Sequence, residues 1–461
     1  EAARKILRDL DEFNSSIPID VISQTNPVLI LDEPQSLEGK ATKERLKEFK
    51  ALFTLRYSAT HKYPYNMIYK LDAVDAYNER LVKRIQVKGI SQTSLTGTSG
   101  YIYFDGLNIS KAAPTANLEL EIKYKGGVKR KMVRVEEGDN LYIKSNELEA
   151  YLDGFTVSQI DGRDNSIEFT NGSRLYAGDV VGQVDEDVIR RIQIRETIKS
   201  HLEKERDLYN MGIKVLSLFF IDEVANYRVY DEDNVAHNGL YADIFEEEYE
   251  KVFSSFQLKY GGESYVNYLE NFKPADTHQG YFSVDNKGRI KNTRGQSNDD
   301  ISTYDLIMKN KELLLDRDPK KSPVRFIFSH SALKEGWDNP NVFQICTLKH
   351  SDSQISKRQE VGRGLRLCVN QKGDRMDKES LGELVHDMNI LTVIASDSYS
   401  QFVRDLQKDI KDNLYDRPTK ATREYFFGKI VASEKASREI TDKEASDIVF
   451  YLIRSDYINN D

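Results

Sequence analysis

Two adjacent carboxylates, Asp32 and Glu33, stand directly after the apolar run Val28–Leu31. Such a run predicts a buried strand, and ligands of open parallel sheets bind at the carboxyl ends of the strands. One carboxylate at such a position can hold Mg²⁺ while its neighbour orients an attacking water. The alternative is that the acids cap the helix that follows, and the pair alone does not decide between these interpretations.

A second set of polar side chains lies far downstream, in the segment SKRQEVGRGLRL. Gln359, Arg363 and Arg366 are spaced by four and three residues, which predicts one face of a helix. Gly362 and Gly364 would allow close backbone approach. Guanidinium groups bind phosphate bidentately and stabilise the charge that develops in phosphoryl transfer. Arginines on a helix are more often surface residues, but three such side chains with two glycines favour a phosphate site.

The segment SHSALKEGWDNPNVFQI lies between these two sites along the chain. It places Ser331, Gly336 and Asp338 in a predicted loop before an apolar strand, together with Trp337, the single tryptophan. An indole can stack on a nucleotide or a DNA base. The alternative is that Trp337 is a packing residue.

The residues around the acid pair have the pattern of an α/β domain. Apolar strands at 27–32 and 51–55 flank a polar helix, which favours a parallel sheet over residues 1–85. In the next hundred residues, LELEIKYK and VKRKMVRV alternate around two glycines, and SIEFT and SRLYAG flank Asn171–Gly172. We therefore expect a β-rich insertion at 88–183. It should protrude as a separate lobe, because antiparallel hairpins do not continue a buried parallel sheet.

One strand of the first predicted hairpin is basic and could contact phosphate, although a solvated face is the commoner role of such a strand. The basic residues of this hairpin are Lys123, Lys125, Lys129, Arg130, Lys131 and Arg134.

A second α/β region follows the insertion. Residues 185–210 have helical spacing with acids at the start, where the helix dipole favours them. IKVLSLFFID, VRFIFS, VFQICTL and ILTVIA are apolar strands, and helical patterns cover 241–272 and 301–315. These elements predict a second parallel-sheet domain over 186–415, with a polar surface loop at 284–300.

Composition limits the class of protein. The 461 residues suggest about three domains. The 66 basic and 75 acidic residues give a net charge of -9, so no global basic field points to nucleic acid, although a local basic groove can still bind phosphates. Cys346 and Cys368 cannot build a disulfide framework and suit a reducing compartment. We find no signal peptide and no apolar run long enough to span a membrane. The expected class is a cytoplasmic multi-domain protein, and the start at Glu1 within a helical pattern predicts the middle of a longer chain.

The order of these motifs resembles that of superfamily-two helicase motors. DEPQ, SAT, KEGWDNPNV and QEVGRGLR are similar to their motifs II, III, V and VI, and LSLFFIDEVANY takes the place of motif IV. More closely, ILDEPQSLEGK, LRYSATHKYPYN, VLSLFFIDEVANYR, THQGYFSVD and SHSALKEGWDNPNVFQICTL resemble the Res subunit of type III restriction-modification enzymes. The resemblance covers most of residues 1–415. It implies two RecA-like parallel-sheet domains, with 1–85 the end of the first and 186–415 the second, and ATP bound in the cleft between them.

The resemblance also implies a role for the first pair of motifs. Asp32 would coordinate Mg²⁺ and Glu33 would activate the attacking water. Ser58 and Thr60 of the SAT triplet would link the state of ATP to closure of the two domains.

The later motifs would supply the other half of the site. Gln359, Arg363 and Arg366 would reach the γ-phosphate, with Arg363 or Arg366 as the arginine finger. Gly336 and Asp338 would couple the nucleotide to the DNA strand.

Two motifs of the complete enzyme are not found in this sequence. It contains no G-x-x-x-x-G-K-[ST] phosphate loop, which in the family lies upstream of motif II, and no convincing P-D…(D/E)-x-K nuclease signature. We therefore expect a motor-region fragment that does not hydrolyse ATP at a useful rate on its own, with 416–461 as a helical linker toward a nuclease domain. The family implies duplex DNA and a modification (methyltransferase) subunit as partners, and the latter carries the DNA recognition site.

Two alternative functions stay open at this point. The first is another superfamily-two DNA or RNA helicase, and a flanking nuclease, present or absent, would decide it. The second is a non-catalytic scaffold that binds DNA or the methyltransferase. Intact DEPQ and QxxGRxxR motifs argue against a scaffold, which does not need both halves of an ATP site.

Overall fold

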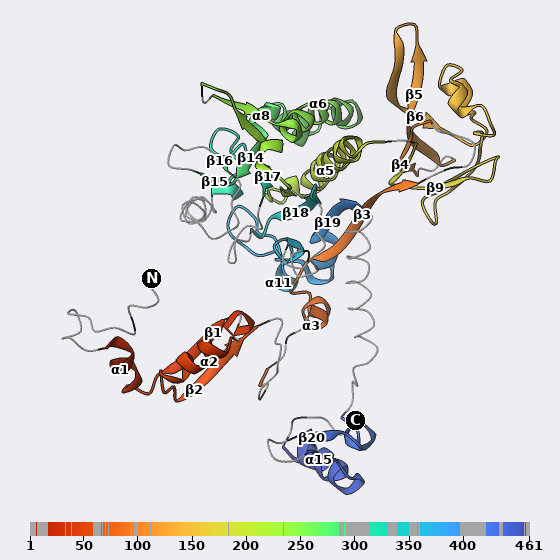
Figure 1. The fold of residues 1–461 in the computed structure, drawn as a ribbon. Coiled ribbons are helices and arrows are strands. Elements are labelled where there is room, and N and C mark those ends of the chain that lie inside the picture. Colours follow the sequence, from red (N-terminus) through yellow and green to blue (C-terminus); the bar gives the residue numbers. More distant parts are fainter. Residues whose placement is uncertain are drawn as a thin grey trace. The chain divides into compact units, whose positions relative to one another are not determined.

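The computed structural model divides the chain into two compact units, Glu1–Asp75 and Ala76–Asp461 (Figure 1). The structure describes the following residues: 6, 17–32, 34–37, 39–58, 66, 68–69, 71, 73–93, 95, 100–109, 113–182, 184–233, 235–284, 290–291, 313–330, 339–349, 357, 360–396, 421–432, 437–455 and 457. The unit boundary falls within α3 (Ala73–Asn78), ahead of the boundary at 85 predicted from sequence.

The first unit contains a parallel pair of strands. β1 (Val28–Asp32) pairs in register with β2 (Phe53–Tyr57). The other elements of this unit are α1 (Pro18–Ser23), η3 (Pro34–Leu37) and α2 (Lys40–Lys47). The prediction of a buried strand is wrong for β1, because Val28 and Ile30 are 45% and 64% exposed. The described residues of this unit leave one face of the two-stranded sheet uncovered.

The second unit is built on a ten-stranded sheet that is mostly parallel. From one edge its strands are β14 (His278–Tyr281), β17 (Phe326–Ser329), β11 (Leu216–Phe220), β18 (Val342–Thr347), β19 (Ile390–Ser396), β3 (Arg84–Thr93), β10 (Asp179–Val181), β4 (Ile102–Asn108), β5 (Thr115–Tyr124) and β6 (Gly127–Val135). Neighbours from β14 to β10 are parallel, and those from β10 to β6 are antiparallel.

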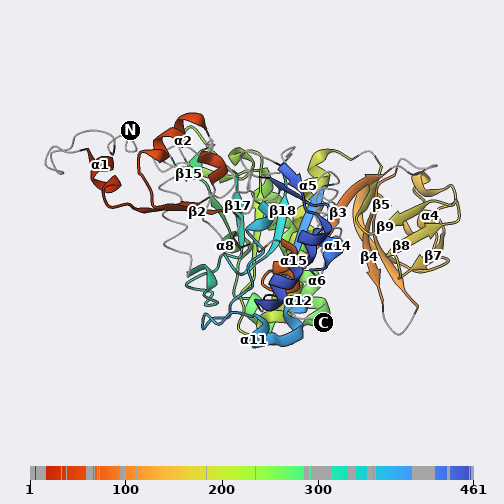
Figure 2. The same cartoon turned by 90° about the horizontal axis from the view of Figure 1, so that it is seen from below.

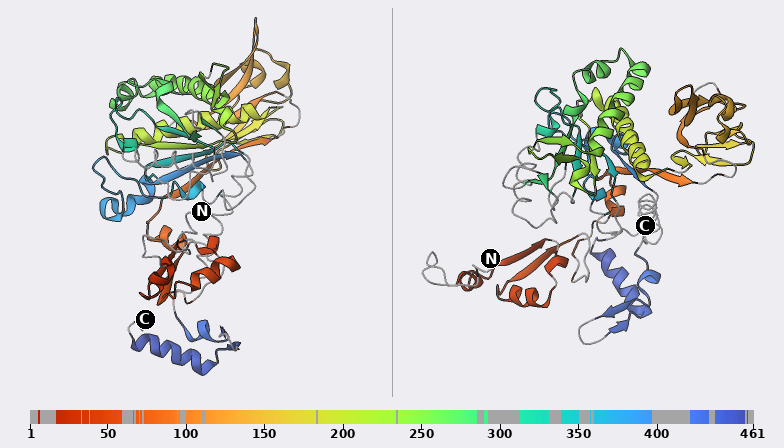
Figure 3. Two further views of the ribbon diagram at one scale, coloured as in Figure 1. Left: turned by 60° about the vertical axis from the view of Figure 1, so that its left-hand side comes forward. Right: turned by 45° about the horizontal axis from the view of Figure 1, so that its top comes forward.

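Both faces of the parallel part are covered, as its apolar strands require. α5 (Glu186–Tyr209) packs on β18, β19 and β11, and α6 (Leu240–Tyr260) packs on α5, so these helices lie along one face (Figure 3). An aromatic core including Phe219, Phe245 and Phe328 fills that side. On the opposite face Leu218 and Val393 belong to an aliphatic core that also contains Val361, next to the predicted phosphate-binding arginines.

The insertion is β-rich, as predicted, and it has its own core beneath β4 and β5 (Figure 2). The prediction that it would not continue the parallel sheet is wrong. β3 is long enough to serve both parts, because Arg84–Ile90 pair with β19 while Ser91–Thr93 pair with β10. The predicted insertion boundary at 88 therefore cuts through a strand of the main sheet.

Both predicted hairpin turns are present. Gly127 begins β6 opposite Tyr124, and Asn171–Gly172 lie in the turn between two strands of a small sheet, with Gly172 at a φ of 79°. The remaining strands and helices of the insertion are β7 (Val157–Asp161), β8 (Ser166–Phe169), β9 (Arg174–Tyr176), α4 (Leu141–Lys144) and η4 (Glu149–Tyr151).

Shorter elements complete the second unit. They are η5 (Val224–Asn226), β12 (Arg228–Tyr230), β13 (Ala236–Asn238), α7 (Ser264–Leu269), α8 (Pro274–Thr277), β15 (Ser283–Val284), β16 (Ile290–Lys291), η6 (Leu313–Leu315), α11 (Lys378–Leu381), η7 (Gly382–Leu384) and α12 (Val385–Met388). In the predicted loop at 284–300, the described residues contribute to a short antiparallel pair, and most of the predicted helix 301–315 lies outside the described residues.

The last residues hold more than the helical linker predicted for 416–461. Their described part contains α14 (Arg423–Phe426), the antiparallel strands β20 (Ile430–Ala432) and β21 (Ser437–Glu439), and α15 (Asp442–Arg454).

Candidate functional site

Asp32 and Ser58 lie at one edge of the parallel pair in the first unit. Asp32 is the last residue of β1 and is paired with Tyr57, the last residue of β2, so Ser58 follows immediately beside it. The Asp32 side chain is exposed and Ser58 is half-buried. Asp32 and Ser58 therefore lie at the carboxyl ends of adjacent parallel strands, the edge at which such sheets bind ligands.

Several predicted site residues lie outside the described residues. They are Glu33, Thr60, Ser331, Gly336, Trp337, Asp338 and Gln359.

The arginine segment differs from the single helix face predicted for it. Residues 360–362 are helical, but Arg363 and Gly364 form a turn. Arg366 then lies in an extended segment, where it forms an isolated antiparallel bridge with Val82. The spacing rule fails here because the helix ends at Gly362, four residues before Arg366, so the helix does not carry Arg366 on the same face.

The two arginines differ in exposure. Arg363 is only 9% exposed, whereas the side chain of Arg366 is exposed. The turn between them is anchored by Glu360, which is fully buried and forms an ion pair with Lys349 at 2.7 Å. Lys349 lies just after β18, so the parallel sheet fixes where this turn sits.

Of the two glycines, only Gly364 is needed for close approach. A Cβ built on Gly364 would lie 2.5 Å from Leu391 Cδ1 and 3.2 Å from Ile345 Cδ1, both in the aliphatic core. A Cβ on Gly362 would meet no heavy atom within 4 Å. The prediction of close backbone approach is confirmed for Gly364 and wrong for Gly362.

Two buried polar residues near the arginines were missed from sequence. Asn341 donates to the carbonyl oxygen of Val369 at 2.9 Å and accepts from its N–H at 2.8 Å, which ties the segment after KEGWD to the segment after the arginines. Lys83 is 1% exposed, and its ammonium group contacts backbone carbonyls of both segments. Burial lowers the pKa of Lys83 to about 7. No local pattern marks either residue, because their partners are distant along the chain.

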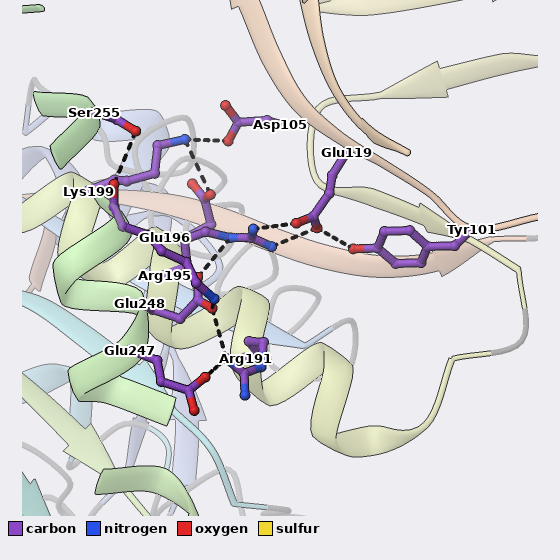
Figure 4. Close-up of polar contacts among 11 residues, drawn as sticks. Tyr101, Asp105, Glu119, Arg191, Arg195, Glu196, Lys199, Glu247, Glu248 and Ser255 are labelled. Carbon is purple, nitrogen blue, oxygen red and sulfur yellow. Dashed lines mark hydrogen bonds and ion pairs between the residues drawn. The ribbon is translucent and has the colours of Figure 1, made fainter. Parts of the chain in front are cut away.

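A network of charged side chains joins the insertion to α5 and α6 (Figure 4). Arg195 on α5 holds the carboxylate of Glu119 on β5 through two bonds of 2.7 and 2.9 Å. The hydroxyl of Tyr101 donates to the same carboxylate at 2.6 Å. On its other side, Arg195 Nε lies 3.7 Å from Glu248 Oε2 on α6. Fork geometry and low exposure make the Arg195–Glu119 pair a strong contact.

A second branch of this network centres on Glu196, which is fully buried (Figure 4). Its carboxylate pairs with Lys88 of β3 and with Lys199 of α5, which also pairs with Asp105 of β4. Burial alone would raise the pKa of Glu196, but the two lysines outweigh it and hold that pKa well below the usual range. The carboxylate is therefore charged at neutral pH.

The described residues include the one magnesium ligand predicted from sequence, Asp32. No cluster of three metal-ligating side chains occurs in the described part of the chain. Mg²⁺ in phosphate-transfer sites keeps most of its waters and takes one or two carboxylates together with substrate phosphates. The exposed Asp32 carboxylate at the end of β1 suits that arrangement.

Among the described helices, none is both long and apolar enough to cross a membrane.

No protein-family model matches the chain. The chain is similar to curated restriction enzymes, however. It is 35% identical over 362 residues to the type III restriction-modification enzyme EcoPI Res subunit of Escherichia phage P1, which covers 77% of this chain and 34% of that protein. It is 32% identical over 369 residues to the EcoP15I Res subunit of Escherichia coli, covering 78% and 35%. It is 28% identical over 400 residues to the StyLTI Res subunit of Salmonella typhimurium, covering 78% and 37%.

Among solved structures, the chain is similar to an ATP-dependent Type ISP restriction-modification enzyme, LlaBIII, bound to DNA. That match has a TM-score of 0.33 and 12% identity, and covers 96% of this chain and 30% of the other.

The comparisons relate the chain to restriction-system proteins. It is a homologue of the Res subunits of type III restriction-modification enzymes over about 78% of its length. The resemblance seen in the motifs is thereby confirmed. The chain spans about a third of the length of these relatives.

Proposed function

We propose that this chain is the motor region of a type III restriction enzyme Res subunit, which uses ATP hydrolysis to drive movement on duplex DNA. Its homology to Res subunits supports the class, and one structural observation supports the chemistry. Asp32 and Ser58 lie at the carboxyl ends of adjacent parallel strands, where a nucleotide and its metal ion would bind.

In this proposal each motif keeps the role that the family gives it. Asp32 holds Mg²⁺ and Glu33 activates the attacking water. Ser58 and Thr60 respond to the state of the nucleotide.

The arginine turn supplies the positive charge. Gln359, Arg363 and Arg366 act on the γ-phosphate of ATP, and the exposed Arg366 is our candidate for the arginine finger. Gly336 and Asp338 couple the nucleotide to the DNA strand.

The proposal also assigns the domains. The first unit is the end of one RecA-like domain, the parallel part of the large sheet is the second, and the β-rich segment is an insertion between them. ATP and Mg²⁺ are the cofactors, and duplex DNA and a modification (methyltransferase) subunit are the partners. Nuclease activity would belong to the complete enzyme, since this sequence has no nuclease signature.

The carboxylate pair gives the first test. In the longest natural chain that contains this sequence, Glu33→Gln should keep ATP binding but lose turnover, because it preserves shape and removes the base. Asp32→Asn should also weaken binding of Mg²⁺. ATP hydrolysis and nucleotide binding are measured with duplex DNA and the modification subunit present. Turnover within a few-fold of wild type for Glu33→Gln would show that Glu33 is not the base.

A further inference from the structure

Lys83 is a buried lysine that joins two motifs of the proposed ATP site. Its Nζ donates to the carbonyl oxygen of Pro340 at 2.6 Å and to that of Gly364 at 3.2 Å. It also donates to the carbonyl oxygen of Arg366. Pro340 follows the KEGWDN segment, so one ammonium group contacts the segments of motif V and motif VI together.

These three contacts use the full donor capacity of the side chain. An ammonium group has three N–H donors and no acceptor, and lysine is almost never fully buried unless its charge is compensated. Here the compensation comes from backbone carbonyls and from the ring of Phe343, whose centroid lies 4.8 Å from Nζ. Because the acceptors are backbone atoms, the lysine fixes the path of the chain rather than the conformation of a side chain.

The backbone beside Lys83 makes the same connection. The N–H of Lys83 donates to the carbonyl oxygen of Leu365 at 2.8 Å, and Val82 forms the bridge with Arg366. Residues 82–83 therefore act as a short strand against the arginine turn.

The segment before Lys83 is held in the second unit by two further contacts. Arg80 forms an ion pair with Glu383, and the ring of Tyr77 stacks on His386 at 4.4 Å. The start of the second unit is thus attached to the residues around the arginine turn.

We propose that Lys83 is a positioning residue for ATP hydrolysis, which holds the ends of motifs V and VI in one arrangement and so sets where Arg363 and Arg366 project. This proposal rests on the proposed function. Lys83 does not touch the nucleotide in this scheme; it acts through the backbone of the turn that carries the arginines.

The test substitutes Lys83→Met, which keeps the length of the side chain and removes all three donors. Lys214→Met is the matched control. Lys214 is also 1% exposed, and its Nζ donates to the carbonyl oxygens of Asp316 at 2.8 Å and Ser322 at 2.7 Å, which lie outside both motifs. Burial lowers the pKa of both lysines to about 7, so the assays are run below pH 7, where each carries its proton.

Steady-state ATP hydrolysis is measured in the longest natural chain that contains this sequence, with duplex DNA and the modification subunit. Lys83→Met should lower kcat by roughly 10- to 100-fold and change KM for ATP little, because a displaced charge near the phosphate costs rate more than binding. Lys214→Met should leave kcat close to wild type at equal folded fraction. Equal kcat values for the two variants would overturn the proposal. If Lys83→Met does not fold, Lys83→Gln takes its place, because glutamine keeps an N–H donor on a shorter side chain. Its kcat is then compared with that of Lys214→Met.

A second readout does not depend on catalysis. Hydrogen exchange of the backbone amides at 363–368 should be about tenfold faster in Lys83→Met than in Lys214→Met, because the turn loses its anchor. Unchanged exchange would also overturn the proposal. A wild-type protein without ATP turnover would refute the proposed function instead, and the exchange measurement would still decide whether Lys83 holds the turn.

Discussion

Arg363 and Arg366 have the spacing of a shared helix face, but the structure gives them different surroundings. Arg363 is nearly buried, and Arg366 lies beyond a turn in an extended segment. The sequence identified both arginines and the need for a glycine between them. It did not predict the turn, because the early end of the helix depends on contacts that Arg366 and Gly364 make with Lys83, far away in sequence.

Gly364 offers a test at the residue scale. Gly364→Ala should destabilise the protein by about 1–3 kcal/mol, because its Cβ would overlap Leu391 in a packed core. Gly362→Ala is the control; it is exposed with open space around it, so alanine should be neutral or slightly stabilising. Urea unfolding of both variants measures the difference. Equal stabilities would mean that the turn does not pack on β19 as described.

At the scale of elements, β3 and α5 connect the insertion to the second α/β region. The strands β11, β17, β18 and β19, the helix α5 and the β5–β6 hairpin follow from local patterns and were predicted from sequence. The double pairing of β3 was not, because strand neighbours distant in sequence leave no local periodicity. The network of charged side chains on α5, which we call the junction, was missed for the same reason. Its ion pairs Arg195–Glu119 and Lys199–Asp105 join residues of separate elements.

Removing one partner of the Arg195–Glu119 ion pair should lower the free energy of unfolding. Arg195→Met should destabilise the protein by about 3–5 kcal/mol, because it leaves Glu119 charged and poorly solvated. Arg163→Met is the control, because the Arg163 side chain is 88% exposed in its pair with Asp161 and such pairs contribute little. The test compares the free energies of unfolding in urea of the two variants with that of the wild type. A loss for Arg195→Met no larger than that for Arg163→Met would show that the junction does not hold the insertion.

The junction also predicts how stability depends on pH. The pKa of Glu196 is held below that of a glutamate in the unfolded chain. At acidic pH the folded state therefore binds fewer protons than the unfolded chain does. The stabilisation is therefore fully present above pH about 4.5 and is lost as the pH falls below it. Glu196→Gln should be less stable than wild type at pH 7 and should lose less on acidification. A pH series of urea midpoints that runs parallel for the two proteins would contradict this.

At the scale of the whole molecule, the chain contains two compact units that divide the proposed motor residues between them. Asp32 and Ser58 belong to the first unit, and Arg363, Arg366 and Lys83 belong to the second. The resemblance to type III Res subunits could be predicted from five ordered motifs, and homology to these proteins confirms it. Local patterns could not show how the ten-stranded sheet carries both the parallel region and the insertion.

We also predict that the 461 residues alone do not hydrolyse ATP at a useful rate. The phosphate loop supplies the backbone N–H groups and the lysine that hold the β- and γ-phosphates, and this sequence has no such loop. An arginine finger contributes about 10³ to 10⁵ in rate, but only on a phosphate that is already positioned. Steady ATP turnover by the purified chain with duplex DNA, removed by Arg363→Ala, would reveal a phosphate site that we have not recognised.

The central proposal is that Asp32 at the end of β1, its neighbour Glu33 and the arginine turn act on one ATP. A double-mutant cycle of kcat in the longest natural chain that contains this sequence tests it most directly, with Glu33→Gln, Arg366→Ala and the two combined. Groups that act on the same transition state are strongly non-additive. We predict that each single change lowers DNA-stimulated turnover and that the double variant is hardly slower than the slower single one. Losses that multiply in the double variant, or a wild-type rate for Arg366→Ala, would contradict a single site built from both motifs.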